Sequence, residues 1–311
     1  MVKSNNLLSI AIPVYNFESY LPSCLESILN EAFEYNVEVL IYDGCSTDNT
    51  QLVARSYQQE YPNLRYIKAL KKGGIDFDMA KSVELVTGRY CWLFSGDDIA
   101  RPQAIKTILS TIEKWKPDLI LCRHNECDYD LNFIKDWPLL NIKEDRLFQL
   151  DDEQDRSKYF SLALTSEAFF SFMGGLIIKR ETWLREQLNP ELDGSCWAHV
   201  GRLWSLTRYP FSLYYIHEAI LDRRGGNDSF SNDGMLARLR IQIAGLLNAI
   251  GTVFEINSDA AQNLKRVIKG EVYPDWVNAV KANLRSMNAP EEQHDELQDL
   301  LGKIEITTKS K

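Results

Sequence analysis

The sequence lacks the glycine-rich loops that bind phosphate groups in many nucleotide-binding proteins. Neither GxGxxG nor GxxxxGKS/T occurs in its 311 residues, so the chain supports neither a dinucleotide-binding motif nor a P-loop. Any phosphate that the protein binds must be neutralised by another arrangement of side chains.

Cysteine pairs with metal or disulfide spacing are also absent. The six cysteines include no CxxC pair and no zinc-ligand spacing, which indicates reduced thiols in a cytoplasmic protein. Positive charge is scarce as well, because 44 acidic residues outweigh 35 Lys and Arg residues and the net charge is −9. This balance argues against a nucleic-acid partner, since nucleic-acid-binding surfaces are rich in Lys and Arg.

No hydrophobic run has the character of a membrane span. The early apolar run, 7–12, is too short for the core of a signal peptide. The longest candidate, 159–178, contains Glu167 and two adjacent glycines, so we expect a buried helix followed by a strand. With 45% hydrophobic and 25% charged residues, the composition is that of a globular protein with one large or two modest domains.

The first third of the chain alternates between strand and helix patterns. Continuous apolar runs predict strands at 7–12, 37–42, 64–69 and 89–94. The segments between these runs have apolar residues at helical spacing. Strands joined by right-handed helical crossovers form a parallel sheet. We therefore expect an α/β fold with a doubly wound, mainly parallel sheet flanked by helices.

The pattern changes beyond this region. Residues 125–155 are polar with scattered aromatics, which suggests an excursion or lid. Later patterns predict strands at 174–179, 211–216 and 219–223 and a helix at 194–208. Apolar residues at helical spacing between 236 and 253 predict a packed helix rather than a membrane contact. We expect a helical C-terminal extension.

The segment 89–98 shows the strongest sign of a functional site. Ser95, Gly96, Asp97 and Asp98 directly follow its apolar part. Ligands of open parallel sheets bind at the carboxyl ends of strands, and two adjacent carboxylates repel unless a cation relieves the repulsion. A divalent metal shared with phosphate oxygens fits this pattern. The alternative is a first helical turn, where acids favour the positive end of the helix dipole.

Further polar residues follow the first two predicted strands. Pro13, Tyr15 and Asn16 come after the first strand, and Asp43 ends the second. We expect all four at the same sheet edge as the paired acids, where Asp43 can accept a hydrogen bond from a base or a ribose. The alternative for Asp43 is an Asx turn with Gly44.

Three ordered segments, 11–16, 41–48 and 88–98, resemble the signatures of family 2 glycosyltransferases with the GT-A fold. The resemblance covers residues 5–125. Shorter segments at 74–76, 95–98, 197–199 and 226–230 resemble the abequosyltransferase-like branch of that family. Members of this branch add sugars to bacterial surface polysaccharides.

The resemblance implies a nucleoside-diphosphate sugar as donor. It places Pro13, Tyr15 and Asp43 around the nucleoside, Asp76 on the donor side, and Mg²⁺ or Mn²⁺ near Asp97. We predict Asp97 as the direct metal ligand, and Ser95, Gly96 and Asp98 as contacts of the nucleotide sugar, with Asp98 orienting its neighbours or the sugar. A divalent cation would stabilise the charge that develops on the leaving phosphate. For Asp76, a solvated acid at a helix start is the alternative.

Two positions depart from the family pattern. Ser95 stands where many members have the first acid of Asp-x-Asp, which puts the metal affinity in question. Cys196 stands where many members have the acid that acts as base. Direct displacement at an anomeric carbon needs a group that takes the acceptor proton. The candidates are His199, which has a suitable ordinary pKa, and Asp193; a packed histidine is the alternative for His199.

The loop that begins at Arg223 carries two guanidinium groups and a flexible backbone. Arg223, Arg224 and Asn227 are predicted to bind the diphosphate, since Arg can bind phosphate with two hydrogen bonds. Asp228 is predicted near the metal. The alternative is an exposed turn with solvated arginines.

Taken with the resemblance, these residues predict an inverting, metal-dependent glycosyltransferase of O-antigen or capsule biosynthesis. The expected acceptor is a saccharide, either free or linked to a polyprenyl diphosphate, with peripheral contact at the inner face of the cell membrane. We expect a GT-A domain over 1–230, with a nucleotide-sugar half (1–125) and an acceptor half (126–230), followed by the helical extension 231–311.

Two other functions compete with this one. A sugar nucleotidyltransferase usually carries a glycine-rich basic loop after its first strand, and Pro13 to Asn16 do not form one. A non-catalytic nucleotide-sugar-binding protein is suggested by Ser95 and Cys196, which replace family acids.

Overall fold

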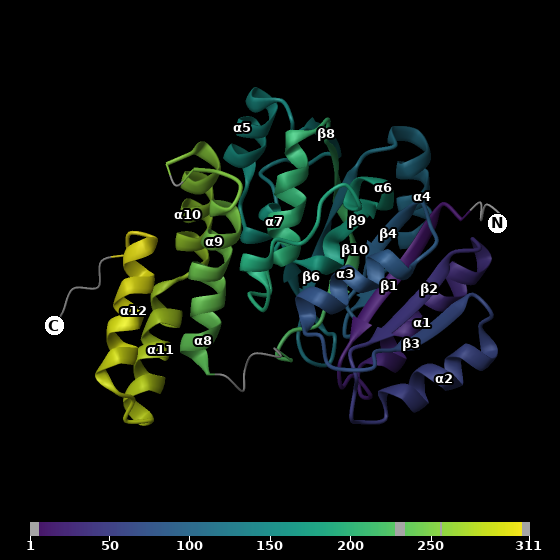
Figure 1. Cartoon of the computed structure of the whole chain (residues 1–311), viewed down its shortest axis with the longest axis horizontal. Helices are drawn as coiled ribbons and strands as arrows, with labels where there is room; N and C mark the ends of the chain where they lie inside the picture. The colour runs from purple at the N-terminus through teal and green to yellow at the C-terminus, as the bar shows by residue number, and fades with distance from the viewer. Residues whose placement is uncertain (1–5, 228–233, 256, 307–311) are drawn as a thin grey trace.

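The computed structural model describes residues 6–227, 234–255 and 257–306. Within these ranges the strands form one ten-stranded sheet. Helices cover the sheet, and the helices from the C-terminal part of the chain, α8 to α12, form a group beside it (Figure 1). The predicted α/β class and the predicted helical C-terminal region are confirmed.

One half of the sheet is parallel, in the order β3-β2-β1-β4. Its elements are β1 Leu8–Val14, α1 Leu21–Glu34, β2 Glu38–Asp43, α2 Thr50–Glu60, β3 Leu64–Lys68, α3 Ile75–Leu85 and β4 Tyr90–Leu93. Every residue of β1, β2 and β4 is buried. Two separate hydrophobic clusters, one on each face of the sheet, account for this burial. Continuous apolar runs are typical of such strands.

The other half of the sheet is mixed. Its elements are β5 Ile99–Ala100, α4 Ala104–Trp115, β6 Leu119–Cys127, β7 Phe133–Asp136, β8 Arg146–Gln149, α5 Glu153–Leu162, β9 Leu176–Lys179, α6 Arg180–Trp183, α7 Ala198–Ser205 and β10 Ser212–Arg223. β9 lies between β4 and β6 and runs antiparallel to both. The sheet is thus less uniformly parallel than predicted, because β9 enters after a long excursion and not through a single helical crossover.

Two local predictions need correction. Residues 125–155 are not only an excursion, because β7 pairs with β6 and β8 pairs with β10. All four residues of β7 are exposed, so no alternation of apolar and polar residues marks this strand. The strands predicted at 211–216 and 219–223 are one strand, β10, which contains register shifts between Ile216 and Leu221.

The C-terminal helices pack directly on the α/β part. They are α8 Met235–Arg240, α9 Leu246–Gly251, α10 Asp259–Glu271, α11 Pro274–Ser286 and α12 Glu291–Lys303, and a π-helical turn, Ile241–Gly245, joins α8 to α9. The Phe254 ring lies 5.7 Å from that of Trp204, so both parts share one hydrophobic cluster. No helix in the described ranges is long and apolar enough to cross a membrane. The boundary at residue 230 stays a prediction.

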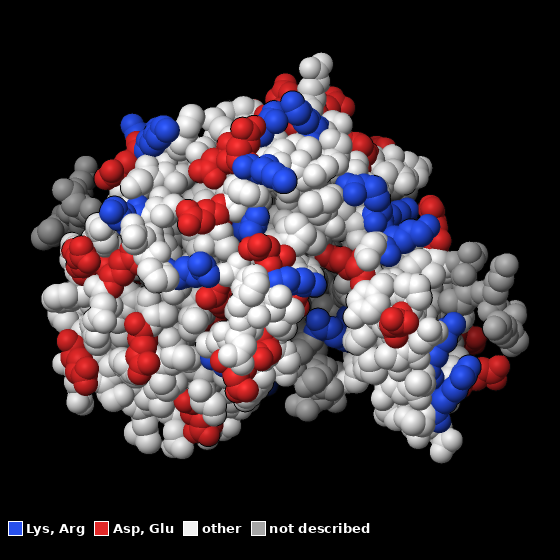
Figure 2. All heavy atoms as spheres, turned by 180° about the vertical axis from the view of Figure 1, so that it is seen from behind, with Lys and Arg blue, Asp and Glu red and all other residues white. Residues whose placement is uncertain are grey.

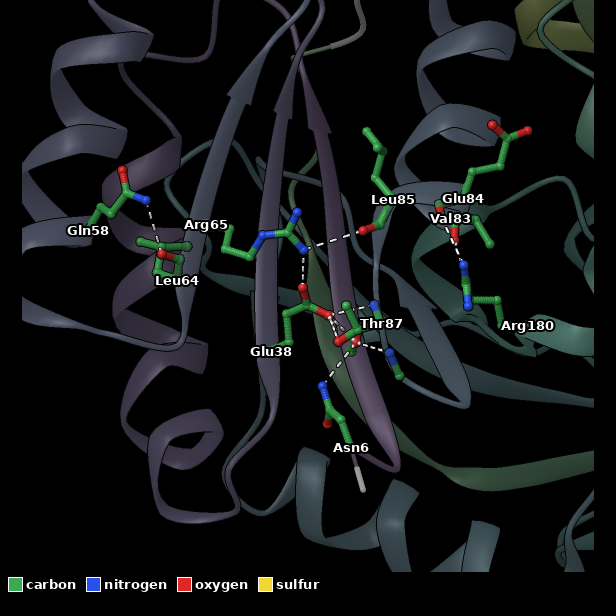
Figure 3. A network of polar contacts seen from close by, with 12 residues as sticks. Asn6, Glu38, Gln58, Leu64, Arg65, Val83, Glu84, Leu85, Thr87 and Arg180 are labelled. Carbon is green, nitrogen blue, oxygen red and sulfur yellow. Dashed lines mark hydrogen bonds and ion pairs between the residues drawn. The ribbon is translucent and has the colours of Figure 1, made fainter. Parts of the chain in front are cut away.

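Glu38 connects several segments by polar contacts at the amino-terminal edge of the parallel strands (Figure 3). Its carboxylate accepts hydrogen bonds from the Ser9 hydroxyl and from the Thr87 backbone N–H, both at 2.7 Å, and it pairs with Arg65. Burial raises the pKa of Glu38, but these donors outweigh burial and lower it. This network lies opposite the carboxyl edge and is structural.

Candidate functional site

The carboxyl ends of β1, β2 and β4 meet at one edge of the sheet, as predicted. The acidic loop that follows β4 packs directly on the end of β1. A Cβ atom added at Gly96 would lie 2.7 Å from Val14 Cγ1, so only glycine allows this approach. The structure therefore brings the paired acids beside the polar residues that follow β1 and β2.

Hydrogen bonds tie the loop after β1 to the loop after β2. The Asn16 backbone N–H donates to Ser46 Oγ at 2.9 Å, and the Thr47 N–H donates to Asn16 Oδ1 at 2.8 Å. Asn16 has a positive φ of 59°. Its side chain thus supports the loop, while Pro13 is buried in register with Tyr42.

Asp43 is fully buried at the end of β2. Its Oδ1 accepts from the Ser46 N–H at 2.6 Å, and its Oδ2 accepts from the Tyr66 hydroxyl at 2.5 Å. Burial, followed by the bond to Asp43, raises the pKa of Tyr66. The Asx-type bond considered as the alternative is therefore present, and Tyr66 holds the carboxylate from the other side.

Tyr15 lies at the same edge and carries a cation on its ring. Lys72 Nζ is 4.0 Å from the centroid of the Tyr15 ring. Lys72 is exposed, so its charge is accessible to an anion. The sequence analysis did not identify Lys72, because a lysine in a polar turn has no distinguishing local pattern.

Asp97 and Asp98 occupy different environments. Asp97 is partly exposed, and its two carboxylate oxygens accept from Ser95 Oγ and Asn227 Nδ2. Asp98 is 2% exposed and accepts from the Arg224 backbone N–H at 2.9 Å. Its Oδ2 has no hydrogen-bond partner among the described residues. Burial, followed by the charge of Asp97, raises the pKa of Asp98 well above its ordinary value.

Arg223, the last residue of β10, and Arg224, which follows it, make different contacts. Arg224 is held against the site loop, because its Nε donates to the Asp97 carbonyl at 2.9 Å and its guanidinium also donates to Ser23 Oγ at 3.0 Å. Arg223 pairs with Glu167 at 3.4 Å and keeps 36% of its side chain exposed. Asp228 lies outside the described residues.

Arg223 pairs with Glu167, and Glu167 is also hydrogen-bonded to the buried His124, a contact that the sequence analysis did not find. His124 Nε2 is 2.7 Å from Glu167 Oε2, and His124 Nδ1 is 3.0 Å from the Asn125 carbonyl. A carbonyl can only accept, so the His124 Nδ1–H donates to the Asn125 carbonyl. These residues are far apart in sequence, and no local signal links them.

Asp76 connects α3 to the start of α7. It is 3% exposed and accepts hydrogen bonds of 3.0 Å each from the backbone N–H groups of Cys196 and Ala198. Burial raises the pKa of Asp76, against these two bonds. Its carboxylate therefore holds the segment that contains Asp193 and Cys196 in place.

The two candidate bases differ in their exposure to solvent. His199 is 3% exposed, and its Nε2 donates to the Phe170 carbonyl at 3.0 Å. Burial lowers the pKa of His199 to about 4, so the ring is neutral at physiological pH. Asp193 is exposed in the loop before α7.

The described residues contain no cluster of three or more His, Cys, Asp or Glu side chains that could enclose a metal. Mg²⁺ is usually bound by only one or two carboxylates, with phosphate oxygens from the substrate completing its shell. Asp97 and Asp98 provide such a pair, and the unpartnered Asp98 Oδ2 fits a cation. The donor set therefore suits a metal that arrives with a phosphate-bearing ligand.

A buried Asp43, a partly exposed Asp97 and a buried Asp98 at the carboxyl edge of the sheet fit a GT-A type transferase. The family model for glycosyl transferase family 2 matches residues 9–171, more than half of the chain. The chain belongs to glycosyltransferase family 2, in its abequosyltransferase-like branch. The abequosyltransferase RfbV of Salmonella typhimurium is 30% identical over 269 residues, covering 85% of this chain and 80% of that protein. The protein is accordingly a glycosyltransferase of polysaccharide biosynthesis.

Solved structures confirm the fold. Staphylococcus aureus TarS in complex with UDP has a TM-score of 0.61 at 16% identity and covers 96% of this chain and 80% of that chain. The mannosyltransferase PcManGT from Pyrobaculum calidifontis, in complex with GDP-Man and Mn²⁺, has a TM-score of 0.55 at 14% identity and covers 94% and 78%, respectively.

Proposed function

We propose that the protein is an inverting, metal-dependent glycosyltransferase. It transfers a sugar from a nucleoside-diphosphate sugar to a saccharide or lipid-linked saccharide during O-antigen or capsule assembly. The convergence of Asp43, Asp97 and Asp98 on one sheet edge carries this proposal. Support comes from the abequosyltransferase relative and from the nucleotide complexes of the two structural neighbours.

In this proposal the donor spans the edge from β2 to β10. Asp43 accepts a hydrogen bond from the nucleoside, and the Tyr15 ring with Lys72 lies beside it. Ser95, Gly96 and Asn227 border the diphosphate, and Arg223 and Arg224 supply positive charge. We assign the phosphate contact to Arg223, which pairs with Glu167 but keeps 36% of its side chain exposed, whereas Arg224 is held by hydrogen bonds at several points.

Asp97, with Asp98 beside it, is proposed to hold Mg²⁺ or Mn²⁺. Such an ion, when bound, acts as a Lewis acid that stabilises charge on the leaving diphosphate. Asp98 also accepts from the Arg224 N–H, so it connects the metal side of the site to the arginine loop. Asp228 lies outside the described residues and stays a predicted ligand.

We assign the base to Asp193. A base must come within hydrogen-bond distance of the acceptor hydroxyl, and Asp193 is exposed, whereas the His199 ring is buried. Asp193 takes the proton as the acceptor oxygen attacks the anomeric carbon. A single displacement of this kind inverts the configuration of the sugar.

Peripheral contact with the membrane would bring the enzyme to a lipid-linked acceptor. Despite the net charge of −9, Lys and Arg side chains gather on the side of the C-terminal helices in Figure 2. α10 alone contributes Lys265, Arg266 and Lys269. Basic side chains near a surface attract anionic lipids, which supports action at the inner face of the cell membrane.

The test is turnover by the purified protein. A panel of UDP-, GDP-, CDP- and dTDP-sugars with Mn²⁺ and saccharide acceptors should release nucleoside diphosphate and form a product of inverted configuration. Asp97→Asn should lower kcat at least about 100-fold, and Asp193→Asn should lower kcat with little change in the donor KM. Full activity of Asp97→Asn would refute the metal assignment, and a fully active Asp193→Asn would refute the base assignment.

A further inference from the structure

A cavity of about 1100 Å³ lies apart from the carboxyl edge of the sheet. The helix formed by α8, the π-helical turn and α9 provides one wall, and residues of α10 and the end of α12 provide others. In Figure 1 this long helix stands between α7 on one side and α10 and α12 on the other. The donor residues do not line the cavity.

The wall of this cavity is largely apolar, and glycines in it leave open space. Ile241, Leu247 and Phe254 contribute hydrocarbon surface. A Cβ atom added at Gly251 or at Gly302 would meet no atom within 4 Å. A concave apolar surface of this size suits a ligand with a long hydrocarbon part.

One end of the cavity reaches the segment of the proposed base. Gly194 and Ser195, which directly follow Asp193, line it. The Trp197 indole donates to the Ile241 carbonyl at 2.8 Å and thereby joins this segment to the π-helical turn. Turns of this kind occur frequently at functional sites. A ligand in the cavity would therefore have one end beside the residue that activates the acceptor.

The cavity also offers a positive charge. Lys265 lines it, and within the described ranges no carboxylate lies at ion-pair distance from Lys265. The other two lining cations are neutralised, because Arg240 pairs with Glu296 and Lys303 pairs with Asp299. The carboxylates of Glu255 and Glu305 also line the cavity, so Lys265 is the one lining group in the described chain that suits an anion.

We propose that this cavity, which we call the helical groove, binds the lipid part of the acceptor, an isoprenoid chain joined to a diphosphate. The apolar wall contacts the chain, Lys265 pairs with the diphosphate, and the saccharide extends past Gly194 toward Asp193. This assignment rests on the proposed function, because it supplies the acceptor site for that reaction.

The first experiment measures binding with farnesyl diphosphate, a soluble isoprenoid diphosphate, by calorimetry on the protein in buffer that contains Mn²⁺. Saturating UDP should leave the affinity unchanged, and inorganic diphosphate should bind at least about 100-fold more weakly, since it lacks the hydrocarbon. Displacement by UDP would place the probe in the donor site and overturn the proposal. Equal affinity for inorganic diphosphate, or no binding of farnesyl diphosphate, would also overturn it.

Variants then locate the bound probe. Gly251→Phe and, separately, Gly302→Leu fill open space and should weaken farnesyl diphosphate binding at least about tenfold, the effect of losing about two buried methylene groups. Gly270→Phe is the matched control, because Gly270 is also helical with open space around its Cβ position but does not line the helical groove. Lys265→Gln should weaken binding of the diphosphate probe as well. Unchanged affinity in both filling variants would overturn the proposal.

Turnover separates this inference from the proposed function. The filling variants should raise the KM for a lipid-linked acceptor while leaving KM and kcat for a lipid-free saccharide acceptor unchanged. If the wild-type protein transfers sugar to neither acceptor, the proposed function fails. If it transfers sugar to the lipid-linked acceptor and the filling variants leave that KM unchanged, only the groove assignment fails.

Discussion

Replacing Asp78 with asparagine should stabilise the protein at neutral pH. Asp78 lies in α3 with 5% of its surface exposed, and its Oδ1 has no hydrogen-bond partner among the described residues. Burial, followed by the charge of Asp43, raises its pKa, and Lys72 compensates only in part. A buried carboxylate close to another carboxylate is unfavourable when it is ionised.

The size of the effect follows from this pKa. A pKa raised from 3.8 to about 6 corresponds to about 3 kcal/mol of lost stability at a pH where Asp78 is ionised in both the folded and the unfolded state, at about 1.4 kcal/mol per pH unit. An asparagine amide would also lack full hydrogen bonding at this position. We therefore expect a net gain of about 1–2 kcal/mol in the free energy of unfolding.

The difference in stability between the wild type and Asp78→Asn depends on pH in a defined way. Between 3.8 and about 6 the folded protein binds more protons at Asp78 than the unfolded chain does. The stability of the wild type relative to Asp78→Asn therefore falls as pH rises through this window. Urea unfolding at pH 4, 5, 6 and 7.5, monitored by tryptophan fluorescence, should show a difference that grows with pH and then levels off.

Asp295→Asn provides the control, because Asp295 is an exposed acid on α12. This variant should change the free energy of unfolding by less than about 0.5 kcal/mol at every pH. An Asp78→Asn protein that is less stable than wild type at pH 7.5, or whose advantage is largest at pH 4, would refute the reasoning.

Other changes test the rest of the structure. Glu38→Gln should destabilise by about 1–3 kcal/mol at pH 7, because Glu38 has a lowered pKa; denaturation curves should show the difference shrinking as pH falls below about 4.5. Tyr66→Phe should cost about 1 kcal/mol and raise the donor KM, because Asp43 loses its Tyr66 partner; wild-type KM would contradict the role of Asp43. Gly245→Ala should lower Tm, because its Cβ atom would lie 2.8 Å from Trp197 Cδ1 and cost about 1–3 kcal/mol of overpacking.

The sequence by itself determined the parallel half of the sheet and the position of the site on it. Strands buried on both faces have continuous apolar sequences, so β1, β2 and β4 could be predicted from local patterns. Asp43 and the acids from Asp97 onward directly follow two of these strands. Their meeting at one edge then follows from the parallel connections alone.

Only the tertiary structure decided which of these polar groups are accessible. Asp76 was predicted on the donor side, with a solvated acid at a helix start as the alternative, yet its carboxylate holds backbone groups of Cys196 and Ala198, more than a hundred residues away. His199 had the ordinary pKa of a base, but burial lowers its pKa to about 4. Burial and long-range hydrogen bonds depend on which segments pack together, and no local pattern encodes that.

The acidic segment after β4 shows both contributions at once. Two adjacent carboxylates at a strand end were readable in the sequence, together with their need for a cation. The sequence did not reveal that the two carboxylates differ in exposure. Asp98 is buried beside Arg224, which follows β10, while Asp97 stays partly exposed. Chain order places acids at the edge of the sheet, and packing against a distant loop determines what each acid can do.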